Sequence, residues 1–153
     1  MITKFGHVSI VSSSYKELAD FYIKVFGCKV KPPVRDLKGP WVDSLTSIKD
    51  AHIKGIHLLL PGFDEQGPTL EIFEYNKVVD DSNKELNKSG FTHIAFGVDD
   101  VKKYIELVLQ HKGSLVGEHV EATVEKAGKI SVVYVRDPEG NIIELQSWSA
   151  TLE

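Results

Sequence analysis

The chain has 153 residues, of which 42% are hydrophobic and 26% are charged, and its formal net charge is −4. This length fits one compact domain or two small units that share a core, and neither needs a disulfide for stability. The weakly acidic charge gives no electrostatic basis for nucleic-acid binding, and no apolar run approaches the length of a membrane span. The N-terminal segment lacks the apolar core of a signal peptide, and the single cysteine, Cys28, fits a reducing compartment. We therefore expect a soluble, cytoplasmic protein.

The N-terminal segment predicts a strand followed by a helix. Residues 7–11 ("HVSIV") have the β-branched composition of a short strand. Ser14 precedes Glu17 by three residues, which is the spacing of a capping box at a helix start. Apolar residues recur at helical spacing over 18–25, and Gly27 suits a left-handed cap at the helix end.

Three further strands are expected around residues 28–32, 53–60 and 68–75. Between the first two of these strands, "PPVRDLKGPWVDSL" contains proline and glycine and predicts a loop that covers a site. Arg35 in this loop is a candidate for binding an anionic substrate group, and Trp41 is a candidate for lining the substrate pocket.

The second half of the chain repeats the first. His93 and Gly113 are 20 positions apart, like the equivalent pair His7 and Gly27 in the first copy. A strand from residue 93, a helix after Asp99 and Asp100, and strands around 114–119, 129–136 and 141–148 follow the same order, with "DPEG" as a tight turn. The prediction is an α+β fold with a first βαβββ module at 1–75, a polar linker at 76–90 and a second βαβββ module at 91–153.

Glu144 lies in an apolar strand ("NIIELQ"), where an unpaired ionised carboxylate is costly. It follows Gly140 by four positions, as Glu71 follows Gly67. Side chains alternate along a strand, so four ionisable residues should project from the faces that the helices leave uncovered. If the repeats pair about a pseudo-twofold axis, these groups can converge on one divalent cation. The predicted metal ligands are His7, Glu71, His93 and Glu144, with His57 as a second-choice histidine that has no matched partner in the repeat.

Several motifs together resemble the vicinal oxygen chelate superfamily, and the resemblance covers almost the whole chain. They are "GHVSIV", "ADFYIKVFG", "GPTLEIFEY", "THIAFGVDD" and "DPEGNIIEL". The superfamily includes glyoxalase I, methylmalonyl-CoA epimerase, extradiol dioxygenases, and fosfomycin and bleomycin resistance proteins. The resemblance implies two modules paired into a cupped, partly open mixed sheet with helices on the outer face. It also implies a metal in the cup and a homodimer.

The His-Glu-His-Glu set most resembles that of glyoxalase I. This resemblance implies a metal-dependent lyase or isomerase that acts on a small carbonyl compound or its thiol adduct. One divalent ion per site, such as Ni, Co, Zn, Mn or Fe, would stabilise negative charge on a substrate oxygen. Glu144 would remove a proton from the adjacent carbon, with Glu71 as second ligand or as the base on the opposite face.

Three alternatives stay open. Acyl-CoA epimerisation of the methylmalonyl-CoA type needs the same proton abstraction, although such epimerases more usually have glutamine at the position of Glu71. An Fe(II) dioxygenase favours two histidines and one carboxylate, and a fourth protein ligand would occupy a position that its chemistry needs open. A resistance protein that only binds a small molecule generally lacks the metal residues. The sequence leaves open whether glutathione or CoA is part of the substrate.

Overall fold

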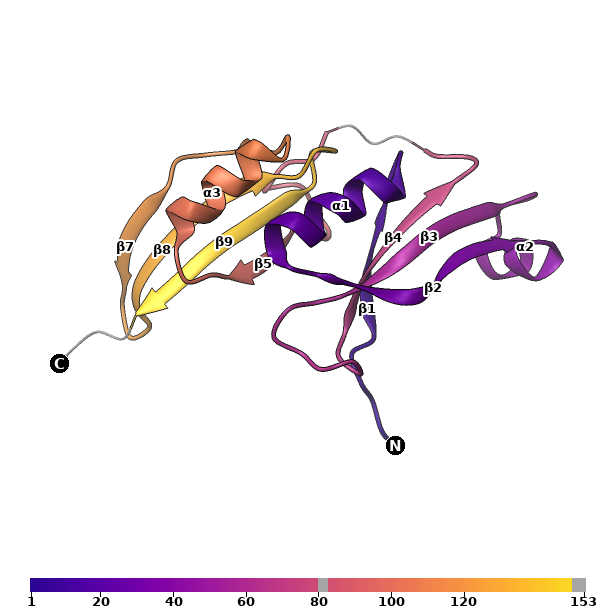
Figure 1. Cartoon of the computed structure of the whole chain (residues 1–153), viewed down its shortest axis with the longest axis horizontal. Coiled ribbons are helices and arrows are strands. Elements are labelled where there is room, and N and C mark those ends of the chain that lie inside the picture. The colour runs from indigo at the N-terminus through magenta and orange to yellow at the C-terminus, as the bar shows by residue number, and fades with distance from the viewer. Residues whose placement is uncertain (80–82, 150–153) are drawn as a thin grey trace. The chain divides into compact units, whose positions relative to one another are not determined.

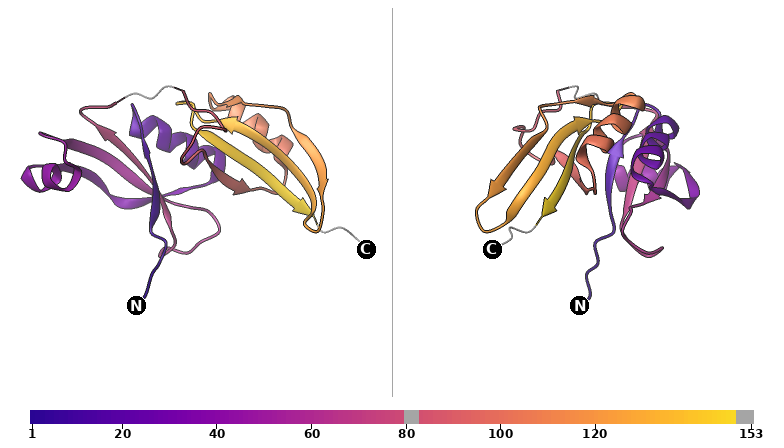
Figure 2. Two further views of the ribbon diagram at one scale, coloured as in Figure 1. Left: turned by 180° about the vertical axis from the view of Figure 1, so that it is seen from behind. Right: turned by 60° about the vertical axis from the view of Figure 1, so that its left-hand side comes forward.

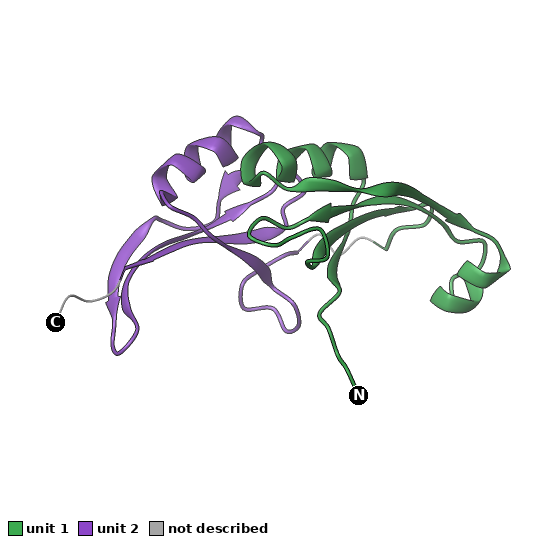
Figure 3. Ribbon diagram, turned by 60° about the horizontal axis from the view of Figure 1, so that its bottom comes forward, with its two compact units in different colours: residues 1–80 green, residues 81–153 purple. Residues whose placement is uncertain are grey.

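The computed structural model describes residues 1–79 and 83–149. The chain divides into two compact units, Met1–Asp80 (unit 1) and Asp81–Glu153 (unit 2), which Figure 3 shows in different colours. Each unit consists of one sheet of mixed strands with a helix packed on it, so the chain is α+β, as the sequence predicts. Within the described residues, no helix has both the length and the apolar character needed to cross a membrane.

Unit 1 follows the predicted order with one additional helix. Its sheet has the strand order β1-β4-β3-β2, in which β1 runs parallel to β4 and the other neighbours are antiparallel (Figure 1). The elements are β1 (His7–Val11), α1 (Tyr15–Phe26), β2 (Lys29–Lys38), α2 (Pro40–Thr46), β3 (His52–Leu59) and β4 (Thr69–Tyr75).

Helix α1 packs on β3 and β4 and forms the core of unit 1. Its apolar stripe is buried, and Leu58, Leu70 and Ile72 of the sheet are fully buried. Ser14 begins the helix, but the predicted capping box does not form. The Ser14 side chain makes no capping hydrogen bond, and the Ser14 N–H donates to Ser12 Oγ at 3.0 Å. Gly27 ends the helix in the left-handed conformation with φ 69°, as predicted.

The predicted covering loop at residues 32–45 is wrong, because this segment forms the second half of β2 and then α2. Prolines 32 and 33 lack an N–H, and the register with β3 shifts between Lys31 and Arg35. From Arg35 onward the strand pairs regularly with β3 again. Pro40 then occupies the first turn of α2, where a missing N–H has no cost. The sequence signals that suggested a loop therefore mark a strand irregularity and a helix start.

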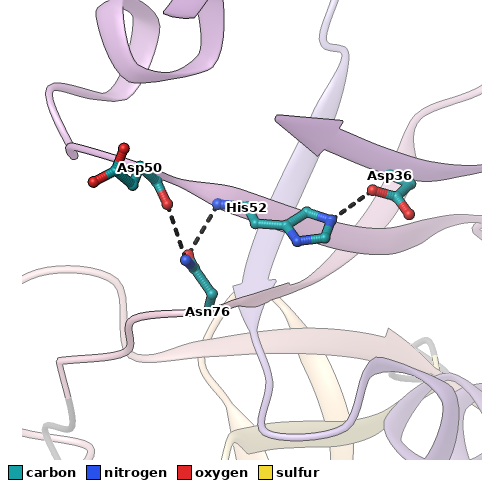
Figure 4. Close-up of polar contacts among 4 residues, drawn as sticks. All are labelled: Asp36, Asp50, His52 and Asn76. Carbon is teal, nitrogen blue, oxygen red and sulfur yellow. Dashed lines mark hydrogen bonds and ion pairs between the residues drawn. The ribbon is translucent and has the colours of Figure 1, made fainter. Parts of the chain in front are cut away.

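Helix α2 buries Val42 against a small apolar cluster that includes Ala51, Ile53 and Phe73. The ends of β3 and β4 beside this cluster are joined by Asn76, as Figure 4 shows. The His52 N–H donates to Asn76 Oδ1 at 2.9 Å, and Asn76 Nδ2 donates to the Asp50 carbonyl at 2.9 Å. The Asn76 side chain therefore links the loop at Asp50 to the start of β3 by hydrogen bonds to their backbone groups.

Unit 2 repeats the arrangement on a sheet of order β5-β9-β8-β6, with β7 also pairing to β8. Here β5 runs parallel to β9, as β1 does to β4. The views in Figure 2 show the helix-on-sheet layering of each unit from other sides. The elements are β5 (His93–Gly97), α3 (Val101–Gln110), β6 (Ser114–Leu115), β7 (Val120–Val124), β8 (Gly128–Arg136) and β9 (Ile142–Ser149).

Three details of unit 2 differ from the predictions. The strand expected at 114–119 shrinks to β6, and the unpredicted β7 pairs with β8. All residues of β7 are exposed, so this strand has no buried face of the kind that an alternating apolar pattern predicts. Asp100 begins α3 as expected, because its Oδ1 accepts from the Lys103 N–H at 3.1 Å. The repeat places Gly113 at the position of Gly27 and so predicts that it ends the helix, but α3 ends three residues earlier, at Gln110.

The "DPEG" segment forms the predicted tight turn between β8 and β9. The buried Asp137 side chain accepts hydrogen bonds from the backbone N–H groups of Glu139 and Asn141. Lys84, from the predicted linker, donates to the Glu139 carbonyl at 3.0 Å. The described linker residues, 76–79 and 83–90, contain no helix or strand, and residues 80–82 of the predicted linker lie outside the described residues.

Candidate metal centre

The matched histidines and glutamates occupy the same register in the two sheets. His7 lies opposite Thr69 on the parallel neighbour, two positions before Glu71. His93 lies opposite Ile142, two positions before Glu144. The predicted alternation of faces is also present. The residues on either side of each glutamate are fully buried in the core, whereas the two glutamate side chains are 12% and 15% exposed.

In unit 1, two histidines approach one oxygen of Glu71. His57 Nε2 lies 3.1 Å from Glu71 Oε2, and His7 Nε2 lies 3.7 Å from the same oxygen. Strand β3 carries His57 directly opposite Glu71, and β1 carries His7 on the other side of β4. One ligand atom from each residue lies within 4.8 Å of the others. Three neighbouring strands therefore bring two imidazoles and one carboxylate together.

Contacts with Thr69 and Phe73 orient the imidazole ring of His57. Its Nδ1 lies 2.9 Å from Oγ1 of the buried Thr69, and its ring meets the Phe73 ring edge-on at a centroid distance of 5.8 Å. Burial lowers the pKa of His57, and this effect outweighs the opposing attraction of the Glu71 carboxylate. The neutral imidazole, which is the form that binds metal ions, is thereby favoured.

Unit 2 builds a similar pair with a different third member. His93 Nε2 lies 3.0 Å from Glu144 Oε2, and His93 Nδ1 lies 2.9 Å from Thr92 Oγ1. Tyr134 on β8 is directly opposite Glu144, and its hydroxyl is hydrogen-bonded to that carboxylate. Burial raises the pKa of Tyr134, and the Glu144 charge raises it further, so the phenol stays protonated and donates. The Tyr134 ring meets the His93 ring edge-on at 5.2 Å.

His57 and Tyr134 therefore occupy equivalent positions, each directly across from its glutamate. Alignment of the two repeats made His57 a second-choice ligand and did not single out Tyr134. The connection before β4 is longer than the one before β9, so the two residues do not align when the repeats are counted from their glycines. The last two strands of each module are antiparallel. Matching their residues outward from the connecting turn would have placed His57 opposite Glu71 and Tyr134 opposite Glu144.

The residues of unit 1 fit a divalent metal ion. Ligand atoms about 2.0–2.2 Å from such an ion lie roughly 3–4 Å apart, so the cluster in this structure needs only small side-chain rotations to close around one. Imidazole ligands suit Zn, Ni and Fe, whereas an all-oxygen ligand set suits Ca. The Thr69 hydroxyl on His57 Nδ1 is an outer contact of the kind that orients metal-binding histidines.

The two predicted substrate residues lie in different settings. Arg35 is on β2 opposite Gly55, and its positive charge contributes to the lowered pKa of His57. Its side chain also donates to the Pro33 carbonyl. Trp41 lies on α2 and is 56% exposed. Arg35 thus belongs to the surroundings of the unit 1 cluster, and a substrate role for either residue stays a prediction.

Residues 4–145 match the family described as the Glyoxalase/Bleomycin resistance protein/Dioxygenase superfamily. The chain belongs to this superfamily. No curated protein sequence matches the chain.

Solved structures show the same fold at low sequence identity. A glyoxalase family protein from Bacillus cereus is 20% identical, with a TM-score of 0.82, over 97% of this chain and 95% of its own. A glyoxalase family protein from Enterococcus faecalis is 21% identical, with a TM-score of 0.60, over 94% of this chain and 96% of its own. The genomically encoded fosfomycin resistance protein FosX from Listeria monocytogenes is 16% identical, with a TM-score of 0.56, over 100% of this chain and 97% of its own.

Proposed function

We propose that the protein is a metal-dependent lyase or isomerase of the glyoxalase type. The observation that carries this proposal is the matched His–Glu pair in each unit. In both, a carboxylate from the last strand faces the Nε2 of a histidine from the first strand. A carboxylate and an imidazole held together in this way are suitable ligands for a divalent ion. Superfamily membership supports the same assignment.

The proposed ligands of the ion are His7, Glu71, His93 and Glu144. When bound, the ion would act as a Lewis acid that stabilises negative charge developing on a substrate oxygen. Glu144 is the proposed base that removes a proton from the carbon next to that oxygen, with Glu71 as the second candidate. The Tyr134 hydroxyl, hydrogen-bonded to Glu144, would hold that carboxylate in a fixed orientation.

The proposed substrate is a small carbonyl compound or its thiol adduct, and the alternative is an acyl-CoA; in each case the proton would be removed from a carbon next to a carbonyl or hydroxyl group. Arg35 is the proposed contact for an anionic group of the substrate, and Trp41 the proposed aromatic contact. We further propose a homodimer in the cytoplasm, on the resemblance to glyoxalase I.

The test is turnover by protein purified without chelators or a histidine tag and reloaded with each candidate ion. Hemithioacetals and acyl-CoA epimers are the substrates to screen, with exchange of the substrate hydrogen for solvent deuterium as a second readout. Glu144→Gln should lower turnover and exchange by about a hundred- to ten-thousand-fold, because the base is lost. Glu121→Gln, on the exposed strand β7, is the matched control and should match the wild type. Undiminished exchange in Glu144→Gln would refute the assignment.

An Fe(II) dioxygenase is a second candidate, because the cluster in unit 1 consists of two histidines and one carboxylate. This ligand set, with its open positions, is typical of non-haem Fe(II) oxygenases. Oxygen consumption by the Fe(II)-loaded protein with a catechol would favour this candidate. Deuterium exchange without oxygen consumption would favour the lyase or isomerase.

A further inference from the structure

We propose that His57 is an additional metal ligand, and that His7, His57 and Glu71 together retain the ion even when His93 and Glu144 are replaced. The matched repeat positions do not include His57, so this ligand goes beyond the His-Glu-His-Glu set. The inference rests on the proposed function in one respect, since both require a bound divalent ion.

The geometry around Glu71 is the first argument. Oε2 of Glu71 faces Nε2 of His57 at 3.1 Å and Nε2 of His7 at 3.7 Å, so both imidazoles direct the same ring atom at one carboxylate oxygen. The three residues lie on adjacent strands of one sheet, where the paired backbone fixes the separation of their Cα atoms. Ligands on strands are held more accurately than ligands on loops. The ion would therefore enter a site that is already assembled.

The second argument is the support behind His57. Thr69 Oγ1, 2.9 Å from Nδ1, can accept a hydrogen bond from the Nδ1–H, which leaves the Nε2 lone pair directed at the Glu71 side. Phe73 packs against the edge of the His57 ring, and this is possible because Gly55 has no side chain. A Cβ on Gly55 would lie 2.2 Å from Phe73 Cδ1. His57 therefore has a fixed ring orientation, as metal-binding histidines do.

Unit 2 provides an internal comparison. At the position equivalent to His57 it has Tyr134, whose hydroxyl is hydrogen-bonded to Glu144. Unit 2 therefore offers one imidazole and one carboxylate at the corresponding place, where unit 1 offers two imidazoles and one carboxylate. The duplicated site has therefore diverged, and the residues of unit 1 form the more complete ligand set.

A metal-free alternative explains part of the same geometry. His57 Nε2–H could donate a hydrogen bond to Glu71, and the pair would then be a partly buried polar contact. The two explanations differ in what they predict for metal affinity. A hydrogen bond predicts no dependence of affinity on His57, whereas ligation predicts a large one.

The experiment measures Co²⁺ affinity by competition with a chromophoric chelator, together with the visible spectrum of the bound ion. His57→Phe keeps a ring against Phe73 but removes both nitrogens. Thr69→Val keeps all ligands but removes the oxygen at His57 Nδ1. His119→Phe is the matched control, because His119 also has a hydroxyl partner, Ser131 Oγ at 2.7 Å, but lies outside the cluster. Circular dichroism and thermal unfolding show whether each variant is folded.

We expect Thr69→Val to weaken Co²⁺ binding about 10- to 100-fold. His57→Phe should weaken binding at least as much and change the Co²⁺ spectrum, while His119→Phe binds as the wild type does. The double variant His93→Ala/Glu144→Gln should still bind one ion per chain. If His57→Phe does not fold, the Thr69→Val and double-variant results decide the question.

The outcomes separate this inference from the proposed function. Wild-type affinity and spectrum in His57→Phe, or loss of all binding in the double variant, would overturn the ligand assignment and leave the proposed function standing. Full turnover in Glu144→Gln, with weakened metal binding in His57→Phe, would overturn the proposed function alone. A wild-type protein that binds none of the candidate ions would overturn both.

Discussion

Glu71 and Glu144 hold the same register position in their sheets, yet they face different neighbours. Glu71 has an imidazole on each side, whereas Glu144 has His93 on one side and the Tyr134 hydroxyl on the other. This difference suggests different tasks for the two carboxylates. Glu71 is suited to binding a cation, and Glu144 is held by a donor that leaves its remaining oxygen positions for a substrate.

Tyr134→Phe tests the role of that donor. The ring contact with His93 is retained, while the hydrogen bond to Glu144 is lost. We expect the free energy of unfolding to fall by about 1 kcal/mol and turnover to fall as Glu144 loses its fixed orientation. Urea unfolding and steady-state kinetics measure the two effects. A variant with wild-type values of both would show that the hydroxyl has no role.

Cys28 gives a prediction that is independent of the metal. Its side chain is 2% exposed, and burial raises the pKa of its thiol to about 11 from 9.0. Only the thiolate reacts with alkylating reagents, so iodoacetamide at pH 8 should modify the native protein roughly 100-fold more slowly than the urea-unfolded protein. The folded protein holds the thiol proton more tightly than the unfolded chain does, and this difference contributes to stability. The contribution is complete below pH 9 and is lost as the pH rises through about 11. Equal alkylation rates in the native and the unfolded protein would contradict the burial of Cys28.

At the scale of elements, the β3–β4 pair depends on one glycine. The Phe73 ring lies where a side chain of Gly55 would be, and a Cβ there would also lie 2.3 Å from the Ile72 carbonyl. Overpacking of this kind typically costs 1–3 kcal/mol. We therefore expect Gly55→Ala to lower the free energy of unfolding by about that amount, and to weaken metal binding because Phe73 supports His57.

Gly97→Ala is the control for this prediction. Gly97 is also a strand residue, and a Cβ at its position would have no heavy atom within 4 Å. Its effect on the urea midpoint should be small. Equal midpoint shifts in the two variants would show that the clash with Phe73 does not cause the effect.

At the scale of the whole molecule, the fold should not depend on the ion. The core of each unit consists of apolar helix and strand residues, and the proposed ligands lie on the opposite sheet faces. Chelation should therefore leave the far-ultraviolet circular dichroism spectrum unchanged. An ion present at a hundredfold excess over its Kd adds about 2.7 kcal/mol of stability, so its removal should lower Tm by roughly 5–10 °C. Unfolding on chelation would instead indicate a structural metal.

The sequence determined most of the fold because the repeat is visible in it. Gly27 and Asp100 gave the end of one helix and the start of the other, and strand alternation placed Glu71 and Glu144 away from the core. The capping box at Ser14 and the loop at 32–45 were wrong for local reasons. Residues that can cap a helix or form a turn do so only where no competing partner is available.

His57 could not be ranked from the sequence, because its importance lies in a cross-strand pairing. The register of β3 against β4 places it opposite Glu71, and turn length and irregular loops set that register. The same holds for Tyr134 and for the Thr69 hydroxyl behind His57. Composition and spacing determined the two modules, the family resemblance and the four candidate ligands. Only tertiary structure decided which side chains meet, since antiparallel pairing joins residues whose separation along the chain has no fixed value.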